Sequence, residues 1–174
     1  MPPPPDPEIL RRTSIFRSLD QSDFEALVMC LRVRECEAGT VLFREGEPGQ
    51  SMMIVGEGTL IATVRRKGGG EQEINRMGPC ETIGEMAFLD PAPRSATVRA
   101  VTQTTYDELD EDGLATLRRR APTAAAALVW ATMRDVTRRL RRMDRLIQHE
   151  LVRTAPPKSA PKSAPKASSR KGAA

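Results

Sequence analysis

The spacing of hydrophobic residues along the chain changes twice. Residues 21–30 carry apolar side chains at helical spacing behind Asp20, which can cap the helix. From residue 31 to about 107, the spacing is that of short strands separated by turns. The expected strands are residues 31–36, 40–43, 51–55, 59–64, 71–77, 96–101 and 103–107. Short strands with turns at this spacing indicate an antiparallel sandwich or jelly roll. The predicted fold class is mainly β, an antiparallel jelly-roll (double-stranded β-helix) barrel with flanking helices.

Helical spacing returns after the last expected strand. Asp110 can cap a short helix that ends near residue 119, and Pro122 starts a long C-terminal helix that ends near residue 152. Apolar residues of the long helix recur in a heptad pattern, at Val129, Met133, Val136, Leu140, Met143 and Ile147. This apolar seam predicts a homodimer, and the alternative is a helix that packs on the β-domain as a lid.

The long helix also has a face that is rich in arginine. Its members are Arg134, Arg138, Arg141, Arg142 and Arg145. We interpret this face as solvated, because charge-rich helix faces usually point to water. Contact with an acidic partner is the alternative interpretation.

The two ends of the chain have compositions that cannot bury a core. Residues 1–7 are rich in proline and residues 153–174 repeat Lys, Ser, Ala and Pro, so we expect both to be disordered. The tail holds six of the 27 basic residues and none of the 23 acidic residues, which leaves 21 basic against 23 acidic residues elsewhere. The net charge of +4 therefore belongs to the tail. We interpret residues 153–174 as a solubilising tail and residues 8–152 as one domain.

Composition and residue types exclude several classes of protein. No apolar run approaches the roughly 20 residues of a membrane span, and the N-terminus lacks the pattern of a secretory signal, so we expect a cytoplasmic protein. Cys30, Cys36 and Cys80 are an odd number without a close pair, which argues against disulfides and zinc. A metal-dependent enzyme on this fold needs several converging ligands. With His149 as the single histidine, we expect neither a metal nor an enzyme.

Residues 83–98 bring together groups that bind an anion. Gly84 allows a ligand to approach the backbone, and a short helix from Glu85 points free N–H groups at the same place. After a turn with two prolines, Arg94 can return as a two-pronged cation for a phosphate, and Ser95 adds a hydroxyl. Glu85 would repel a phosphate, so we expect it to face a neutral hydroxyl of the same ligand, such as a ribose hydroxyl.

These residues resemble the phosphate-binding cassette of the cyclic nucleotide-binding domain family, which includes catabolite activator proteins and kinase regulatory subunits. The residues that fill the places of the family pattern are Gly84, Glu85, Met86, Ala87, Arg94, Ser95 and Ala96. The resemblance implies that Glu85 binds the ribose 2′-hydroxyl and that Arg94 pairs with the cyclic phosphate. The backbone of residues 84–87 and Ser95 would complete the cradle.

The resemblance also implies a function without catalysis. The chain would be a receptor for cAMP, with cGMP as the alternative, that signals through its C-terminal helix to a separate protein partner. No helix-turn-helix sequence follows Val152, so we do not expect specific DNA binding. In the family this helix caps the base, for which Met143 and Asp144 are the candidates here. The alternative function is an interaction scaffold with a degenerate pocket, whose basic tail contacts nucleic acid or an acidic partner.

The sequence departs from the family pattern just before the cassette. The family often reads Gly-Asp-x-Phe-Gly-Glu, whereas residues 80–85 read Cys-Glu-Thr-Ile-Gly-Glu. The family's first glycine is a turn residue, and this chain has Cys80 in its place. We therefore expect a modified turn with the cradle intact.

Overall fold

The computed structural model describes residues 4–154 of the chain. The chain divides into two units, residues 1–140 and residues 141–174, and the long helix α5 (Pro122–Thr154) belongs to both. The first unit contains all the strands of the described residues. The disorder expected for residues 1–3 and 155–174 falls outside the described residues.

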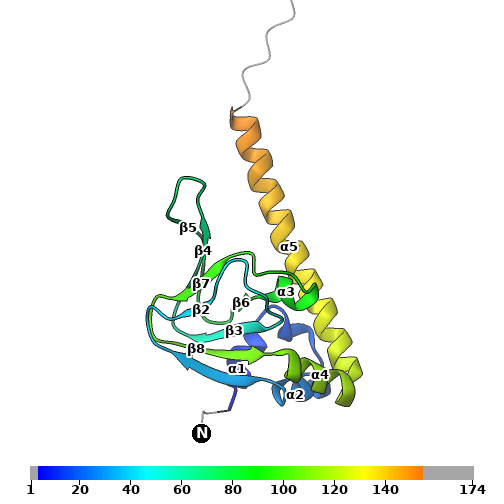
Figure 1. Ribbon diagram of the computed structural model, residues 1–174. Helices are drawn as coiled ribbons and strands as arrows, with labels where there is room; N and C mark the ends of the chain where they lie inside the picture. Colours follow the sequence, from blue (N-terminus) through cyan, green and yellow to red (C-terminus); the bar gives the residue numbers. More distant parts are fainter. Residues whose placement is uncertain (1–3, 155–174) are drawn as a thin grey trace, which may run out of the picture. The chain divides into compact units, whose positions relative to one another are not determined.

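The described strands form two antiparallel sheets of four strands each (Figure 1). The first sheet has the order β1 (Arg32–Cys36), β8 (Thr104–Leu109), β3 (Met52–Glu57), β6 (Thr82–Ile83). The second sheet has the order β2 (Val41–Phe43), β7 (Thr97–Ala100), β4 (Leu60–Arg65), β5 (Glu71–Met77). The seven expected strands are all present, and the short strand β6 was not expected from the sequence.

The mainly β fold with flanking helices and a long C-terminal helix is confirmed, and the two sheets are not closed into a barrel. Backbone hydrogen bonds join the strands within each sheet, and the edge strands of one sheet do not pair with those of the other. Two of these edges are very short, because β2 has three residues and β6 has two. Such strands present too few backbone groups to close a barrel.

Strand β3 separates two buried clusters. Met52 and Ile54 belong to the cluster that the first sheet forms with the helices, and Val55 belongs to the cluster between the two sheets. Side chains alternate between the faces of a strand, so a strand that is covered on both faces reads as a continuous apolar run. This explains why residues 52–55 are all apolar.

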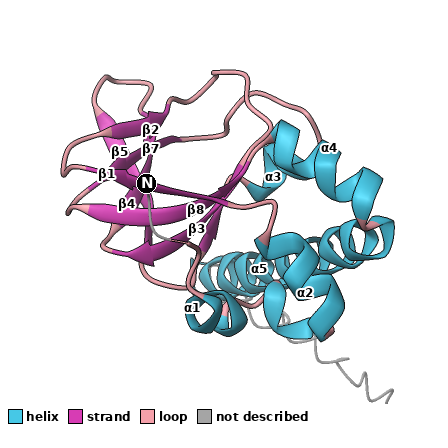
Figure 2. Ribbon diagram, turned by 90° about the horizontal axis from the view of Figure 1, so that it is seen from below, coloured by secondary structure: helices cyan, strands magenta, loops and turns pink. Residues whose placement is uncertain are grey.

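The helices of the first unit gather at one side of the strands (Figure 2). They are α1 (Pro7–Arg12), the 3-10 helix η1 (Phe16–Ser18), α2 (Gln21–Val28), α3 (Glu85–Leu89), α4 (Glu111–Arg120) and the first part of α5. The two predicted caps are confirmed: Asp20 accepts from the Asp23 N–H at 2.7 Å, and Asp110 accepts from the Gly113 N–H at 2.8 Å. Asp6 caps α1, so helical structure begins at Pro7, within the segment expected to be disordered.

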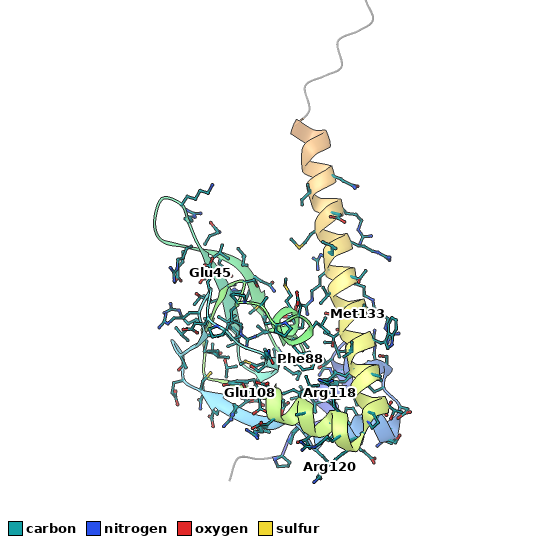
Figure 3. All side chains as sticks on the ribbon, turned by 45° about the vertical axis from the view of Figure 1, so that its right-hand side comes forward. Glu45, Phe88, Glu108, Arg118, Arg120 and Met133 are labelled. Carbon is teal, nitrogen blue, oxygen red and sulfur yellow. The ribbon has the colours of Figure 1, made fainter. Side chains whose placement is uncertain are left out.

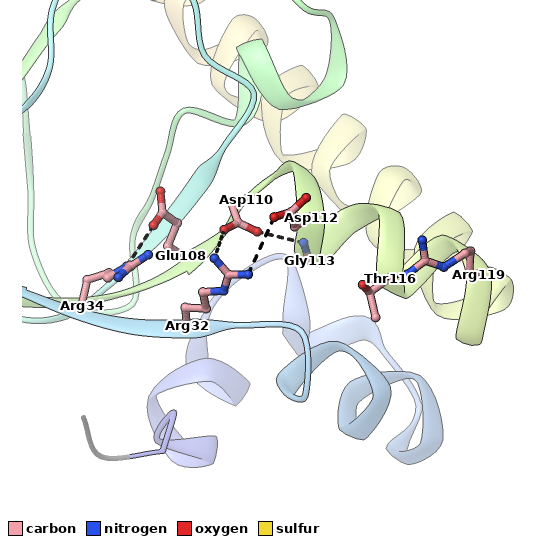
Figure 4. Close-up of polar contacts among 8 residues, drawn as sticks. All are labelled: Arg32, Arg34, Glu108, Asp110, Asp112, Gly113, Thr116 and Arg119. Carbon is pink, nitrogen blue, oxygen red and sulfur yellow. Dashed lines mark hydrogen bonds and ion pairs between the residues drawn. The ribbon is translucent and has the colours of Figure 1, made fainter. Parts of the chain in front are cut away.

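Ion pairs join β1 to the segment where β8 leads into α4 (Figure 4). Arg34 Nε lies 3.2 Å from Glu108 Oε2, and Arg32 Nη1 lies 2.7 Å from Asp110 Oδ2. Both arginine side chains are about half exposed, so each pair contributes only about 0–1 kcal/mol to stability. The Arg32 pair still fixes the carboxylate that caps α4.

Cys80 occupies a turn in a backbone conformation that suits glycine. Its φ is 68°, and no other non-glycine residue among those described has a positive φ. The turn is held by the Cys80 N–H, which donates to the Val55 carbonyl at 2.9 Å, and by the Glu81 N–H, which donates to Gly78. The turn keeps the backbone conformation that suits glycine, and Cys80 occupies it under strain.

Replacing Cys80 by glycine should relieve this strain. We expect Cys80→Gly to raise the free energy of unfolding by about 0.5–1 kcal/mol, because the left-handed conformation costs a residue with a Cβ about 1–2 kcal/mol and glycine loses part of that gain in chain entropy. Urea unfolding measures the change. Cys80→Ala is the matched control, since it keeps the Cβ and the strain. A glycine variant no more stable than the alanine variant would contradict the assignment.

Candidate functional site

A pocket of about 260 Å³ lies beside α3. Its wall contains all seven of the cassette residues predicted from the sequence: Gly84, Glu85, Met86, Ala87, Arg94, Ser95 and Ala96. Apolar side chains of the second sheet, among them Phe43 and Met77, line the same space. Met143 and Asp144 are exposed residues of the second unit, and their role in capping a base stays a prediction.

Arg94 is a buried cation in the wall of this pocket. Its side chain is 6% exposed, and it donates from Nη1 to the Ser51 carbonyl and from Nη2 to Ser51 Oγ, both at 2.9 Å. The guanidinium lies 4.2 Å from the centre of the Phe43 ring. Its buried Nε has no hydrogen-bond partner, and no described carboxylate forms an ion pair with it. Burial lowers the pKa of Arg94, so the side chain would gain from an anionic partner.

Two glycines make room for the Arg94 side chain. A Cβ on Gly49 would lie 2.6 Å from Arg94 Nε. A Cβ on Gly84 would lie 2.6 Å from the Ser51 carbonyl oxygen and 2.7 Å from Arg94 Nη1, and Gly84 also has a φ of 80°. Any side chain at these positions would displace the guanidinium. The sequence motif identified Gly84, but Gly49 lies far from the cassette in sequence and was missed.

Glu85 is a buried carboxylate at the start of α3. It is 7% exposed and lies in the same pocket as Arg94. Burial raises the pKa of Glu85 above its ordinary value, and the nearby charge of Arg139 opposes this effect. Glu85 Oε1 lies 2.8 Å from Arg139 Nη1. The pocket therefore contains the buried carboxylate of Glu85, which can accept a hydrogen bond, and the buried guanidinium of Arg94, whose Nε–H has no partner among the described residues and can donate one.

Arg139 on α5 is a site residue that the sequence analysis missed. Besides its pair with Glu85, it donates from Nη2 to Thr82 Oγ1 at 2.8 Å, and the same nitrogen lies 2.9 Å from Asp135 Oδ2. Asp135 is 7% exposed. A sequence signal existed, because Asp135 stands four residues before Arg139 on the helix, and this spacing brings the two side chains together.

Asp135 extends these contacts to the N-terminal segment. Its Oδ1 accepts a hydrogen bond of 2.6 Å from Ser14 Oγ, just before η1. Glu85, Arg139, Asp135 and Ser14 thus form a continuous series of polar contacts within the first unit. The series connects the wall of the pocket to α5 and to the segment between α1 and η1.

Comparison with known proteins gives the family. The family model of the cyclic nucleotide-binding domain matches residues 33–121, a range that includes the whole cassette, residues 84–96. The chain belongs to this family.

Relatives of this cyclic nucleotide-binding domain include bacterial regulators and a kinase subunit. The CRP-like cAMP-activated global transcriptional regulator of Mycobacterium tuberculosis H37Rv is 32% identical over 78% of this chain and 58% of its own length. The N-terminal domain of a transcriptional regulator from Streptomyces coelicolor A3(2) is 32% identical, with a TM-score of 0.67 over 80% of this chain and 94% of that chain. The regulatory domain of Toxoplasma gondii PKA, solved with cAMP, is 34% identical, with a TM-score of 0.60 over 69% and 44%. The chain thus spans little more than half of the mycobacterial regulator.

Two kinds of feature are absent from the described residues. Within residues 4–154, no helix has the length and apolar character that crossing a bilayer requires. In the same part of the chain, no group of three or more His, Cys, Asp and Glu side chains is arranged to hold a metal ion.

Removing Arg139 should leave Glu85 buried without a partner and leave Asp135 with the hydrogen bond from Ser14 alone. We expect Arg139→Gln to lower the free energy of unfolding at pH 7.5 by about 1–3 kcal/mol, the typical cost of an unpaired buried polar group. The pKa of Glu85, already raised in the folded state, would rise further. The loss should therefore be present at pH 7.5 and shrink as the pH falls toward pH 4, because a growing fraction of Glu85 is then protonated and uncharged in both states.

Urea unfolding at pH 7.5 and at pH 4 measures both quantities. Arg138→Gln is the matched control, because it removes a neighbouring charge without touching Glu85. A loss of stability in Arg139→Gln that is equal at the two pH values would contradict the role of the pair.

Proposed function

We propose that this cyclic nucleotide-binding domain is a non-enzymatic receptor for cAMP that passes its signal to a protein partner through α5. The observation that carries the proposal is Arg94, a buried guanidinium with an unpartnered Nε in the wall of a pocket. The same wall contains the buried carboxylate of Glu85. A ligand that satisfies both must offer an anion and a neutral hydroxyl close together, as a nucleoside cyclic phosphate does.

The cyclic phosphate is proposed to bind Arg94. Ser51 accepts hydrogen bonds from two guanidinium nitrogens and the Phe43 ring covers one face, so the orientation of the guanidinium is established before a ligand arrives. Preorganised donors lose little freedom on binding. The first N–H groups of α3 and the hydroxyl of Ser95 stand at the same wall, and they would complete the phosphate site.

The ribose 2′-hydroxyl is proposed to bind Glu85. An ionised carboxylate accepts strongly from a hydroxyl, and the Arg139 charge counters the effect of burial that would otherwise protonate Glu85. Because Arg139 lies on α5, the residue that senses the ribose also contacts the helix that would carry the signal. Ligand binding at Glu85 would therefore change the forces on α5.

Adenine is the base that we propose, on the strength of two relatives. The mycobacterial regulator is named as cAMP-activated, and the Toxoplasma regulatory domain was solved with cAMP. The apolar side of the pocket, with Ile74 and Met77 on β5, offers a surface for a flat ring. Met143 and Asp144 stay the candidates for capping the base.

Calorimetric titration with cAMP, and separately with cGMP, tests the receptor. We expect micromolar or tighter binding of cAMP, and we expect Arg94→Ala to weaken it by about 2–5 kcal/mol, the cost of removing one partner of a buried charge pair. Arg99→Ala is the matched control, because Arg99 lies on β7 outside the pocket wall.

The outcomes separate the two functions under consideration. If Arg94→Ala is folded, as its circular dichroism would show, and binds with unchanged affinity, then Arg94 does not hold the phosphate. If the wild-type chain binds neither nucleotide, the pocket is silent and the alternative, an interaction scaffold, replaces the receptor.

A homodimer through the apolar seam of α5 is proposed as the active assembly. In the first unit, the part of α5 that packs in the core consists of other residues: Ala124, Ala125, Leu128 and Ala131. The seam residues Met133 and Leu140 are 47% and 56% exposed, and Figure 3 marks Met133. The lid interpretation therefore does not account for the seam in this unit, whereas pairing with a second copy would cover it.

Light scattering of the purified chain tests the dimer. We expect twice the monomer mass for the wild type and the monomer mass for Leu140→Lys, because two lysines would face each other across the seam. Arg145→Glu changes a charge on the opposite face of the helix and should leave the mass unchanged. A wild-type chain that stays monomeric at tens of micromolar would contradict the proposal.

A further inference from the structure

A second, smaller recess lies between η1 and α5, separate from the nucleotide pocket. It has a volume of about 80 Å³ and is lined by Ser14, Arg17, Ser18, Ala131, Arg134 and Arg138. None of these six residues lines the pocket beside α3. The buried Ala131 leaves room at α5 for the recess, and the three arginines surround it.

The charges around this recess are all positive. Arg17, Arg134 and Arg138 take part in no ion pair with the side chains that the structure describes. The hydrogen bond from Arg134 Nη2 to Ser18 Oγ, at 2.9 Å, holds one guanidinium across the recess. The nearest acid in sequence, Asp135, does not line it, because its carboxylate is engaged by Ser14 and Arg139.

Three guanidinium groups around one small space repel one another, and because all three arginines are exposed, solvent and salt weaken this repulsion. Arg134 and Arg138 are four residues apart on α5, a spacing at which like charges destabilise a helix. Arg17 adds a third positive charge from η1. Arg139, the neighbour of Arg138, shows the contrasting case, since it points to two carboxylates. An anion in the recess would relieve the repulsion.

The size and the donors of the recess indicate which anion. A space of this volume holds several water-sized groups but no nucleoside. The hydroxyl protons of Ser14 and Ser18 are directed to Asp135 Oδ1 and to the Ile15 carbonyl, so the free donors are guanidinium N–H groups. Guanidinium groups bind phosphoryl oxygens in two-pronged fashion. We propose that this recess is a binding site for a doubly charged tetrahedral oxyanion, a phosphate group.

Amide NMR spectra of the 15N-labelled full chain test the site, because they distinguish the recess from the Arg94 cradle, which phosphate could also enter. Orthophosphate is titrated at pH 7.5 against sodium chloride of matched ionic strength. We expect saturable shifts at residues 14–18 and 131–138. The double variant Arg134→Gln, Arg138→Gln should weaken binding there by about 10- to 100-fold, the typical effect of losing charged hydrogen bonds, while shifts at residues 84–96 persist.

Arg119→Gln, on α4 outside the recess, is the matched control and should bind phosphate like the wild type. A parallel titration with O-phosphoserine identifies the source of the phosphate: binding of the monoester points to a phosphorylated partner, and exclusion of it points to the free ion. Equal shifts in chloride, or shifts at the recess that survive the double variant, would overturn the proposal. The test needs no cyclic nucleotide, so its failure is distinct from failure of the receptor.

Discussion

The burial of Arg94 without a carboxylate partner is the constraint on which the pocket depends. A buried guanidinium is unfavourable unless its donors are satisfied, and here Ser51 satisfies two of them while Phe43 covers one face. Gly49 and Gly84 leave the space that the side chain occupies. These contacts come from three separate segments of the chain, so the cation is held only where the fold brings these segments together. Nε stays without a hydrogen-bond partner among the described residues, and it is the donor that the proposed phosphate contact would use.

The negative charge in the pocket, on Glu85, has an ionic partner, whereas Arg94 has none among the residues that the structure describes. This partner, Arg139, connects the pocket to the rest of the first unit. Glu85 is paired with Arg139, and Arg139 is shared with Asp135, which in turn accepts from Ser14. A change in the charge or contacts of Glu85 therefore alters the balance of forces on Arg139. In the proposed receptor, a ligand that contacts Glu85 would act on α5 and on the N-terminal segment through this series of contacts, and any coupling between the two ends would be reciprocal.

The sequence predicted the parts of this site that are contiguous and missed those that depend on the fold. Gly84, Glu85 and Arg94 stand in one short segment, where their chemistry can be read in order. Arg139 and Ser51 reach the pocket from distant segments, and no local pattern places them there. The same limit applies to the strands: each expected strand is present, but β6 is too short to show a period, and lateral closure of the sheets is not a property of any one strand.

Helix α5 shows why one hydrophobic pattern can describe two different surfaces. The small residues Ala124 and Ala131 and the large Leu128 pack in the core of the first unit, and Thr132 and Asp135 extend this buried face toward the pocket. The heptad seam lies beside that buried face. Both sets of residues repeat at nearly the same helical spacing, so the sequence pattern alone does not separate them. Burial separates them, since Met133 stays exposed next to the buried Thr132. Small residues let α5 approach the core closely, whereas the larger seam residues Met133 and Leu140 stay exposed.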